Sequence, residues 1–175
     1  FVDWFLWLHS EHGIKLTIFY DHWDRGRFIK GIWTTIHLSF VTIVLSIVIG
    51  IIGAWFQKSR FVWIRLIVQG YIQFFRNPPP LIQLYFFYFA IVTFLSSIFN
   101  IHGGILGSYG WAVVSLSFFA GAFNVEIFRA GVEAVPESTI ESAISLGYSR
   151  RQIYQYVTLP LAFRVCLPAL NNNLI

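Results

Sequence analysis

The sequence predicts an all-α integral membrane protein. Hydrophobic residues account for 57% of its 175 residues and charged residues for only 11%, whereas soluble domains carry about 25% charged residues. Two stretches, residues 31–57 and 77–125, contain no charged side chain at all. An apolar run of about 20 residues spans the hydrocarbon core of a bilayer as a helix. The composition therefore argues against a water-soluble globule.

Four apolar segments are the expected spans, at residues 32–56, 81–99, 111–128 and 165–175. The second and third are separated by a turn at 100–110, because glycines and other turn-forming residues cluster there. The fourth is still apolar where the sequence stops, so we expect a truncation at the C-terminus. The sequence contains no methionine, so we also expect the initiator to be missing.

The basic side chains set the expected orientation. Residues 57–77 carry four basic and no acidic side chains, and residues 129–164 carry four arginines, whereas residues 100–110 carry neither Lys nor Arg. Because Lys and Arg gather in cytoplasmic loops, both long loops are expected inside and the N-terminus outside. Residues 1–30 mix aromatic with charged side chains and are expected to lie on the outer membrane interface.

Neither a disulfide framework nor a metal centre is indicated. Cys166 is the single cysteine, which excludes an internal disulfide and a cysteine-based metal site. Zinc needs a defined tetrahedral set of ligands. The histidines and carboxylates near the N-terminus are too scattered to form one, and they are His9, Glu11, His12, Asp21 and His22.

The segment 131–160 is longer than a loop between two spans requires, and its sequence shows the regular patterns of helices. Residues 136–146 have the apolar periodicity of a short helix with Ile140, Ala143 and Ile144 on one face, and Gly147 would end this helix by adopting the left-handed conformation. A capping box at residues 149–152 starts a second helix, which is expected to end at Leu159–Pro160.

Two protruding helices of this kind suit docking into a groove of a soluble partner. They could instead lie on the membrane surface, with Arg150 and Arg151 near anionic lipid. A helix-turn-helix that binds nucleic acid would need a basic recognition face, which this segment lacks. Nucleic acid is therefore not an expected partner.

The spacing in this segment resembles the EAA loop of ABC-importer permeases, E-A-A-x3-G-x9-I-x-L-P. The matching residues are Glu141, Ser142, Ala143, Gly147, Val157, Leu159 and Pro160. Residues 76–83, 121–131 and 159–164 are similar to stretches of polar amino-acid permeases of the histidine/glutamine type. The resemblance covers residues 31–175 and implies the transmembrane domain of an ABC type I importer. Since that family usually has five spans, one is expected to be missing here.

The resemblance also implies partners and a place in the cell. The EAA segment would dock onto a cytoplasmic ABC ATPase dimer, which binds the ATP and Mg, so no cofactor is expected in this chain. A Walker A lysine cannot be placed in its motif, because the sequence contains no Gly-Lys pair. A second permease subunit, identical or different, and an extracytoplasmic amino-acid-binding protein would complete the importer in the bacterial inner membrane.

Polar side chains inside the expected spans are candidates for the substrate pathway. Amides in lipid are costly unless paired, so at least two of Asn171, Asn172 and Asn173 should face protein or a water-filled path. Hydrogen bonding between helices is at least as good an interpretation as substrate contact, and Asn124, His37 and Gln83 invite the same two interpretations.

Three charged residues near these spans have architectural interpretations. Glu126 and Arg129 are expected to pair as neighbours on one helical face. Arg76 precedes Pro78–Pro80, which are expected to set an extended approach to the second span.

Three other functions compete with amino-acid import. A permease of the same architecture could carry another small solute, since selectivity depends largely on the binding protein. A membrane-embedded enzyme would need ionisable groups that meet in the bilayer, and Glu126 has no second acid or nucleophile beside it. A non-transporting scaffold predicts that changes at Gly147 or Glu141 leave ATP hydrolysis by partners unaffected.

Overall fold

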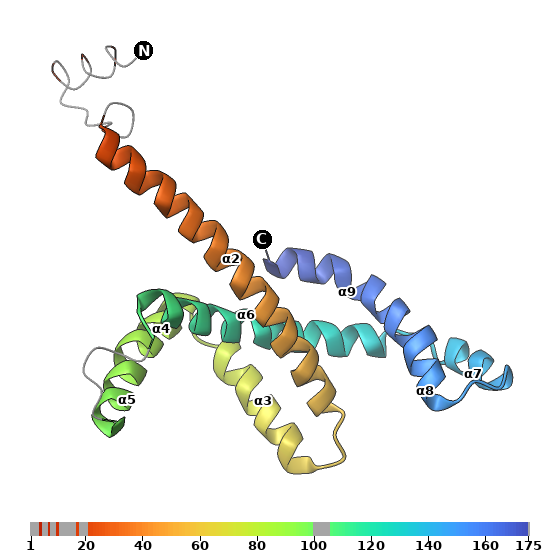
Figure 1. Ribbon diagram of the computed structural model, residues 1–175. Helices are drawn as coiled ribbons and strands as arrows, with labels where there is room; N and C mark the ends of the chain where they lie inside the picture. The colour runs from red at the N-terminus through yellow and green to blue at the C-terminus, as the bar shows by residue number, and fades with distance from the viewer. Residues whose placement is uncertain are drawn as a thin grey trace. The chain divides into compact units, whose positions relative to one another are not determined.

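The computed structural model describes residues 21–99 and 106–174, together with residues 4, 7, 10 and 17 (Figure 1). The elements in these residues are all helices. Most of the interfacial segment expected at 1–30 and most of the turn expected at 100–110 lie outside the described residues, as do His9, Glu11 and His12 of the scattered N-terminal set. The chain divides into two units, residues 1–40 and 41–175, and the packing described below lies within the second.

Helix α2 (His22–Gln57) covers the first expected span but begins earlier, at His22. The reason is local, because the Asp21 carboxylate accepts a hydrogen bond of 2.9 Å from the backbone N–H of Trp23. This is the bond by which a capping residue starts a helix. The boundary expected at residue 30 is therefore not a break in secondary structure.

Three helical runs are long and apolar enough to cross a membrane among the described residues. They are α2, α6 (Ser108–Glu133) and residues 150–173, in which α8 (Arg150–Ile153), the π-helix η3 (Tyr154–Thr158) and α9 (Leu159–Leu174) follow without a break. Helix α6 covers the third expected span, and α9 covers the described part of the fourth.

The helix end expected at Leu159–Pro160 is wrong, because the chain stays helical through both residues. Proline lacks an N–H and its ring collides with the carbonyl one turn earlier in an α-helix. In η3 the turn is wider, and the Leu159 N–H bonds the carbonyl of Tyr154, five residues back. The widened turn accommodates Pro160, so the second helix of segment 131–160 merges with the fourth apolar segment.

Helix α3 (Val62–Arg76) lies in the segment that was expected to be a basic loop. Its buried side chains, Val68, Ile72 and Phe75, recur at helical spacing. Val68 and Ile72 form an apolar cluster with Val125 of α6, and Ala54 of α2 packs against this cluster. The four basic side chains of residues 57–77 conceal this periodicity in the sequence.

The second expected span is a run of three short helices, α4 (Pro80–Tyr85), the π-helix η2 (Phe86–Ile91) and α5 (Val92–Phe99). It follows α3 through a bend of 108°, and this bent pair could form one further span. The expected proline geometry is confirmed, since Pro79 is extended, with ψ of 144°, and Pro80 opens α4.

Gln83 holds the corner between α3 and α4. Its side-chain amide is 3% exposed and donates hydrogen bonds of 2.7 Å to the carbonyl of Phe75 and 3.0 Å to that of Pro78. These carbonyls have no helical partner at a chain reversal. Of its two interpretations, Gln83 therefore fits the architectural one in this structure.

Small residues let the helices of the second unit approach closely. Gly53 of α2 lies against the Val125 side chain, and Gly131 of α6 lies against Cys166 of α9. The Cys166 thiol lies 3.3 Å from the carbonyl of Ile127 and donates to it. Because α6 contacts both α3 and α9, it is the central helix of this unit.

Candidate functional site

The short helix α7 (Glu137–Ser145) ends in a turn whose geometry requires glycine. Gly147 has φ of +83°, its N–H donates to the carbonyl of Ile144 at 2.9 Å, and the Tyr148 N–H donates to that of Ala143 at 3.2 Å. This pair of bonds is the Schellman motif. The predicted helix and its glycine end are both found in the structure.

The next helix starts at the predicted capping box. The Ser149 hydroxyl accepts from the backbone N–H of Gln152, and the Gln152 side chain accepts from the backbone N–H of Ser149 at 2.8 Å. Both bonds satisfy N–H groups that a helix start leaves unpaired. The chain direction from α7 into α8 is thus set by two hydrogen-bonded motifs in succession rather than by a flexible link.

The residues that match the EAA motif differ in their exposure to solvent. Ala143 is buried and Val157 half-buried, whereas Glu141, Ser142, Leu159 and Pro160 are exposed. The apolar face expected for α7 is left partly uncovered, since Ile144 is 58% exposed. Leu146, at the tip of the turn, is 77% exposed. The segment therefore presents unburied apolar side chains next to exposed Glu141, a surface suited to a protein partner.

A buried amide cluster joins three helices of the second unit. Asn124 of α6 is fully buried. Its side-chain N–H donates to the Ser46 hydroxyl of α2 at 3.1 Å, and its carbonyl oxygen accepts from the Asn173 amide of α9 at 2.8 Å. Asn171 and Asn172 are exposed. Of the three consecutive asparagines, the structure brings only Asn173 to Asn124.

Replacing Asn124 by leucine is expected to destabilise the protein by about 1–3 kcal/mol, the usual cost of leaving a buried polar partner unsatisfied. The measurement is the thermal unfolding midpoint of the purified full-length protein in detergent. Asn171→Leu is the matched control, because that side chain is exposed, and its midpoint should stay near that of the wild type. Equal losses in both variants would contradict the structural role given to Asn124.

The pairing expected between Glu126 and Arg129 is wrong. Glu126 forms an ion pair with Arg76 of α3, and Arg129 pairs with Glu133 at 2.6 Å. The Arg76 guanidinium also lies 5.1 Å from the centre of the Phe123 ring. Spacing along one helix could not reveal a partner 50 residues away, which lies close only because α3 packs on α6.

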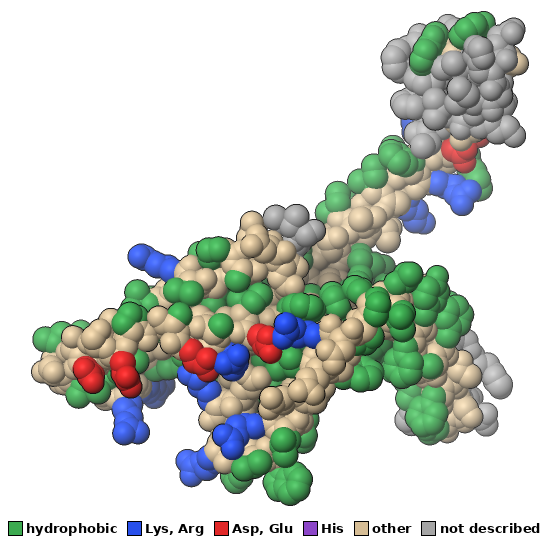
Figure 2. All heavy atoms as spheres, turned by 180° about the vertical axis from the view of Figure 1, so that it is seen from behind, with side chains coloured by type: hydrophobic (Ala, Val, Ile, Leu, Met, Phe, Trp, Pro, Cys, Tyr) green, Lys and Arg blue, Asp and Glu red, His purple; other side chains and the backbone are tan. Residues whose placement is uncertain are grey.

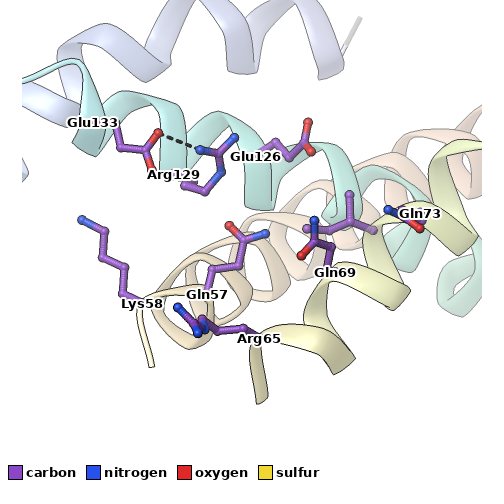
Figure 3. Close-up of a pocket in the computed structure, with 9 residues that line it drawn as sticks. Gln57, Lys58, Arg65, Gln69, Gln73, Glu126, Arg129 and Glu133 are labelled. Carbon is purple, nitrogen blue, oxygen red and sulfur yellow. Dashed lines mark hydrogen bonds and ion pairs between the residues drawn. The ribbon is translucent and has the colours of Figure 1, made fainter. Parts of the chain in front are cut away.

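These charges border a cleft of about 340 Å³ between the end of α2, α3 and α6 (Figure 3). Polar side chains from all three helices line it, with Ile72 as the apolar exception. They are Gln57, Lys58, Arg65, Gln69, Gln73, Glu126, Arg129 and Glu133. None of the glutamines was singled out in the sequence, although Arg65, Gln69 and Gln73 follow one another at the spacing of one helical face.

The described fold, with its apolar spans and a rigid helical turn between α6 and α9, is that of the transmembrane domain of an ABC type I importer. A solved amino acid ABC transporter with histidines has the same fold, with a TM-score of 0.74 and 27% identity over 92% of this chain and 72% of the other. The MetNI methionine ABC transporter in an inward-facing conformation shares the fold at a TM-score of 0.64 and 21% identity, covering 92% and 71%.

Residues 24–175 match the family described as "Binding-protein-dependent transport system inner membrane component", and the chain belongs to this family. Over 153 residues it is 29% identical to the histidine/lysine/arginine/ornithine transport system permease protein HisQ of Escherichia coli (strain K12), covering 85% of this chain and 66% of HisQ. It is 30% identical to the L-cystine transport system permease protein TcyB of Bacillus subtilis (strain 168), covering 83% and 58%. The chain thus spans less than two thirds of the length of these relatives.

Proposed function

We propose that this chain is the permease subunit of an ATP-driven ABC importer that carries polar amino acids across the bacterial inner membrane. The observation that carries the proposal is the stiff connection from α7 to the membrane. The Gly147 turn and the Ser149 capping box lead into one helical run, residues 150–173. A displacement of α7 would therefore be transmitted to the segment that contains Asn173, as conformational coupling requires.

The exposed tip of this segment is the proposed contact with a cytoplasmic ATPase dimer, which would bind the ATP and Mg. Ile144 and Leu146 offer apolar area and Glu141 a charge, the combination typical of a helix that docks into a groove. Residues 141–143, Gly147, Val157, Leu159 and Pro160 would form or support this contact. A second permease subunit and an extracytoplasmic amino-acid-binding protein would complete the assembly.

The proposed orientation follows from the basic side chains of the α2–α3 connection and of the segment after α6. It places α7 in the cytoplasm and the N-terminus outside. Polar amino acids are the proposed substrates because the relatives are named for the transport of such solutes. Asn171 and Asn172, which are exposed in the single chain, are proposed to face the pathway, near the pair of Asn124 and Asn173.

The test is uptake of radiolabelled polar amino acids by proteoliposomes containing the full-length permease with its cognate ATPase and binding protein. We expect uptake only when ATP is present on the ATPase side. ATP-dependent uptake of a different solute alone would favour the permease for another small solute. Partner ATPase activity that no solute and no binding protein changes would favour a non-transporting scaffold.

A further inference from the structure

The polar cleft between α2, α3 and α6 plays no part in the proposed coupling through α7. Arg65, Gln69 and Gln73 occupy one side of α3 and line the cleft (Figure 3). On other sides of the same helix Leu66 is 55% and Ile67 73% exposed, as expected of side chains that meet lipid or another membrane segment. Polar side chains within membrane helices face protein or water-filled cavities. One side of α3 is thus polar and suited to contact with water, whereas the other sides are apolar.

The charges around the cleft do not cancel. Each carboxylate already has an arginine partner, Glu126 with Arg76 and Glu133 with Arg129. Lys58 and Arg65 form no ion pair among the described residues. Lys58 and Arg65 are therefore the charged lining side chains that have no ion-pair partner among those residues, and low-dielectric walls strengthen the field of such charges. Figure 2 shows basic and acidic side chains on the surface of the second unit beside extensive apolar areas.

Gln57, which also lines the cleft, has a hydrogen-bond acceptor without a donor among the described residues. Its side-chain oxygen is buried and has no hydrogen-bond partner in the described part of the chain, although it belongs to a residue that lines the cleft. A buried acceptor without a partner is costly, so a water or a solute that donates a hydrogen bond would be stabilised there.

We propose that this cleft is a water-filled vestibule, open to the cytoplasm, which favours solutes carrying a carboxylate or another anionic group over cationic solutes. The proposal rests on the proposed permease function and narrows its substrate class. Lys58 and Arg65 set the preference. Gln69 and Gln73 line the path without adding charge.

The test measures how fast small charged thiol reagents reach the cleft. Gln69→Cys and Gln73→Cys are made separately in the full-length protein, in a Cys166→Ser background. Inside-out membrane vesicles then receive membrane-impermeant methanethiosulfonates, one anionic and one cationic. The ratio of the two rates cancels differences in the reactivity of the thiol itself, and dividing it by the ratio for a small free thiol in solution removes the intrinsic difference between the two reagents. Ile67→Cys, on another side of α3, is the control for water access and should react with neither reagent.

We expect both cleft cysteines to react, with a rate ratio that favours the anionic reagent. Neutralising the two cations, with Lys58→Gln and Arg65→Gln together, should lower this ratio about tenfold, within the range of electrostatic focusing in charged clefts. Arg150→Gln with Arg151→Gln removes the same charge from residues that do not line the cleft and should leave the ratio unchanged.

Three results would overturn the proposal: no reaction at either cleft cysteine, reaction only in right-side-out vesicles, or a ratio that neutralisation of Lys58 and Arg65 does not change. The reaction needs neither ATP nor the ATPase. Its failure is therefore distinguishable from a failure of the proposed function, which would appear as absent ATP-driven uptake with the reagent preference intact.

Discussion

Gly147→Pro should abolish association of the permease with its ATPase while leaving the protein inserted in the membrane. Gly147 has φ of +83°, whereas proline is locked near −65°. Proline would also remove the N–H that bonds the carbonyl of Ile144. The turn between α7 and α8 would therefore open, and the exposed tip would lose its position. The measurement is co-purification of the full-length protein with the cognate ATPase, beside a membrane-insertion assay.

Two further variants separate turn geometry from surface charge. Gly147→Asn should retain most of the association, because asparagine tolerates the left-handed conformation better than other side chains do. Glu141→Lys leaves the turn intact and reverses a charge on the exposed surface of α7, so it should weaken association without changing stability. If the ATPase stays bound and active with both Gly147→Pro and Glu141→Lys, the segment is not the coupling element.

Gly131→Val should prevent α9 from packing on α6 and should have the largest effect on stability. Even one added carbon at Gly131 would collide with the Cys166 sulfur and would lie 3.0 Å from the carbonyl oxygen of Ala162. Backbone at this distance cannot move aside without separating the helices. Overpacking typically costs roughly 1–3 kcal/mol, and we expect the upper end here. The measurement is the thermal unfolding midpoint in detergent.

Gly70→Val is the matched control for Gly131→Val, because a side chain at Gly70 meets nothing within 4 Å. Its unfolding midpoint should change little. In addition, Gly131→Ala should be partly rescued by Cys166→Ala, which removes the sulfur but leaves the Ala162 carbonyl in place. If Gly70→Val and Gly131→Val are equally destabilised, close packing at Gly131 is not what holds α9 against α6.

Much of the fold could be predicted because its causes are local. A long uncharged apolar segment can be recognised without knowledge of its neighbours, and α2 and α6 are found where such segments lie. The glycine end of α7 and the capping box of Ser149 were also predictable, since each depends on residues within one or two helical turns. Helix α3 was missed because basic side chains on one side hid the apolar periodicity of the other.

The membrane class, the main apolar helices and the rigid turn around Gly147 could all be recognised from the order of the residues. The pairing of polar side chains became evident only in the folded chain, where Asn124 meets Asn173, Glu126 meets Arg76, and polar residues of three helices line one cleft. The two pairs join residues some 50 positions apart. They depend on the close approach of α3 and α9 to α6, where Gly121 lies next to Tyr71 and Gly131 next to Cys166, and no pattern within one segment of the sequence reveals such an approach.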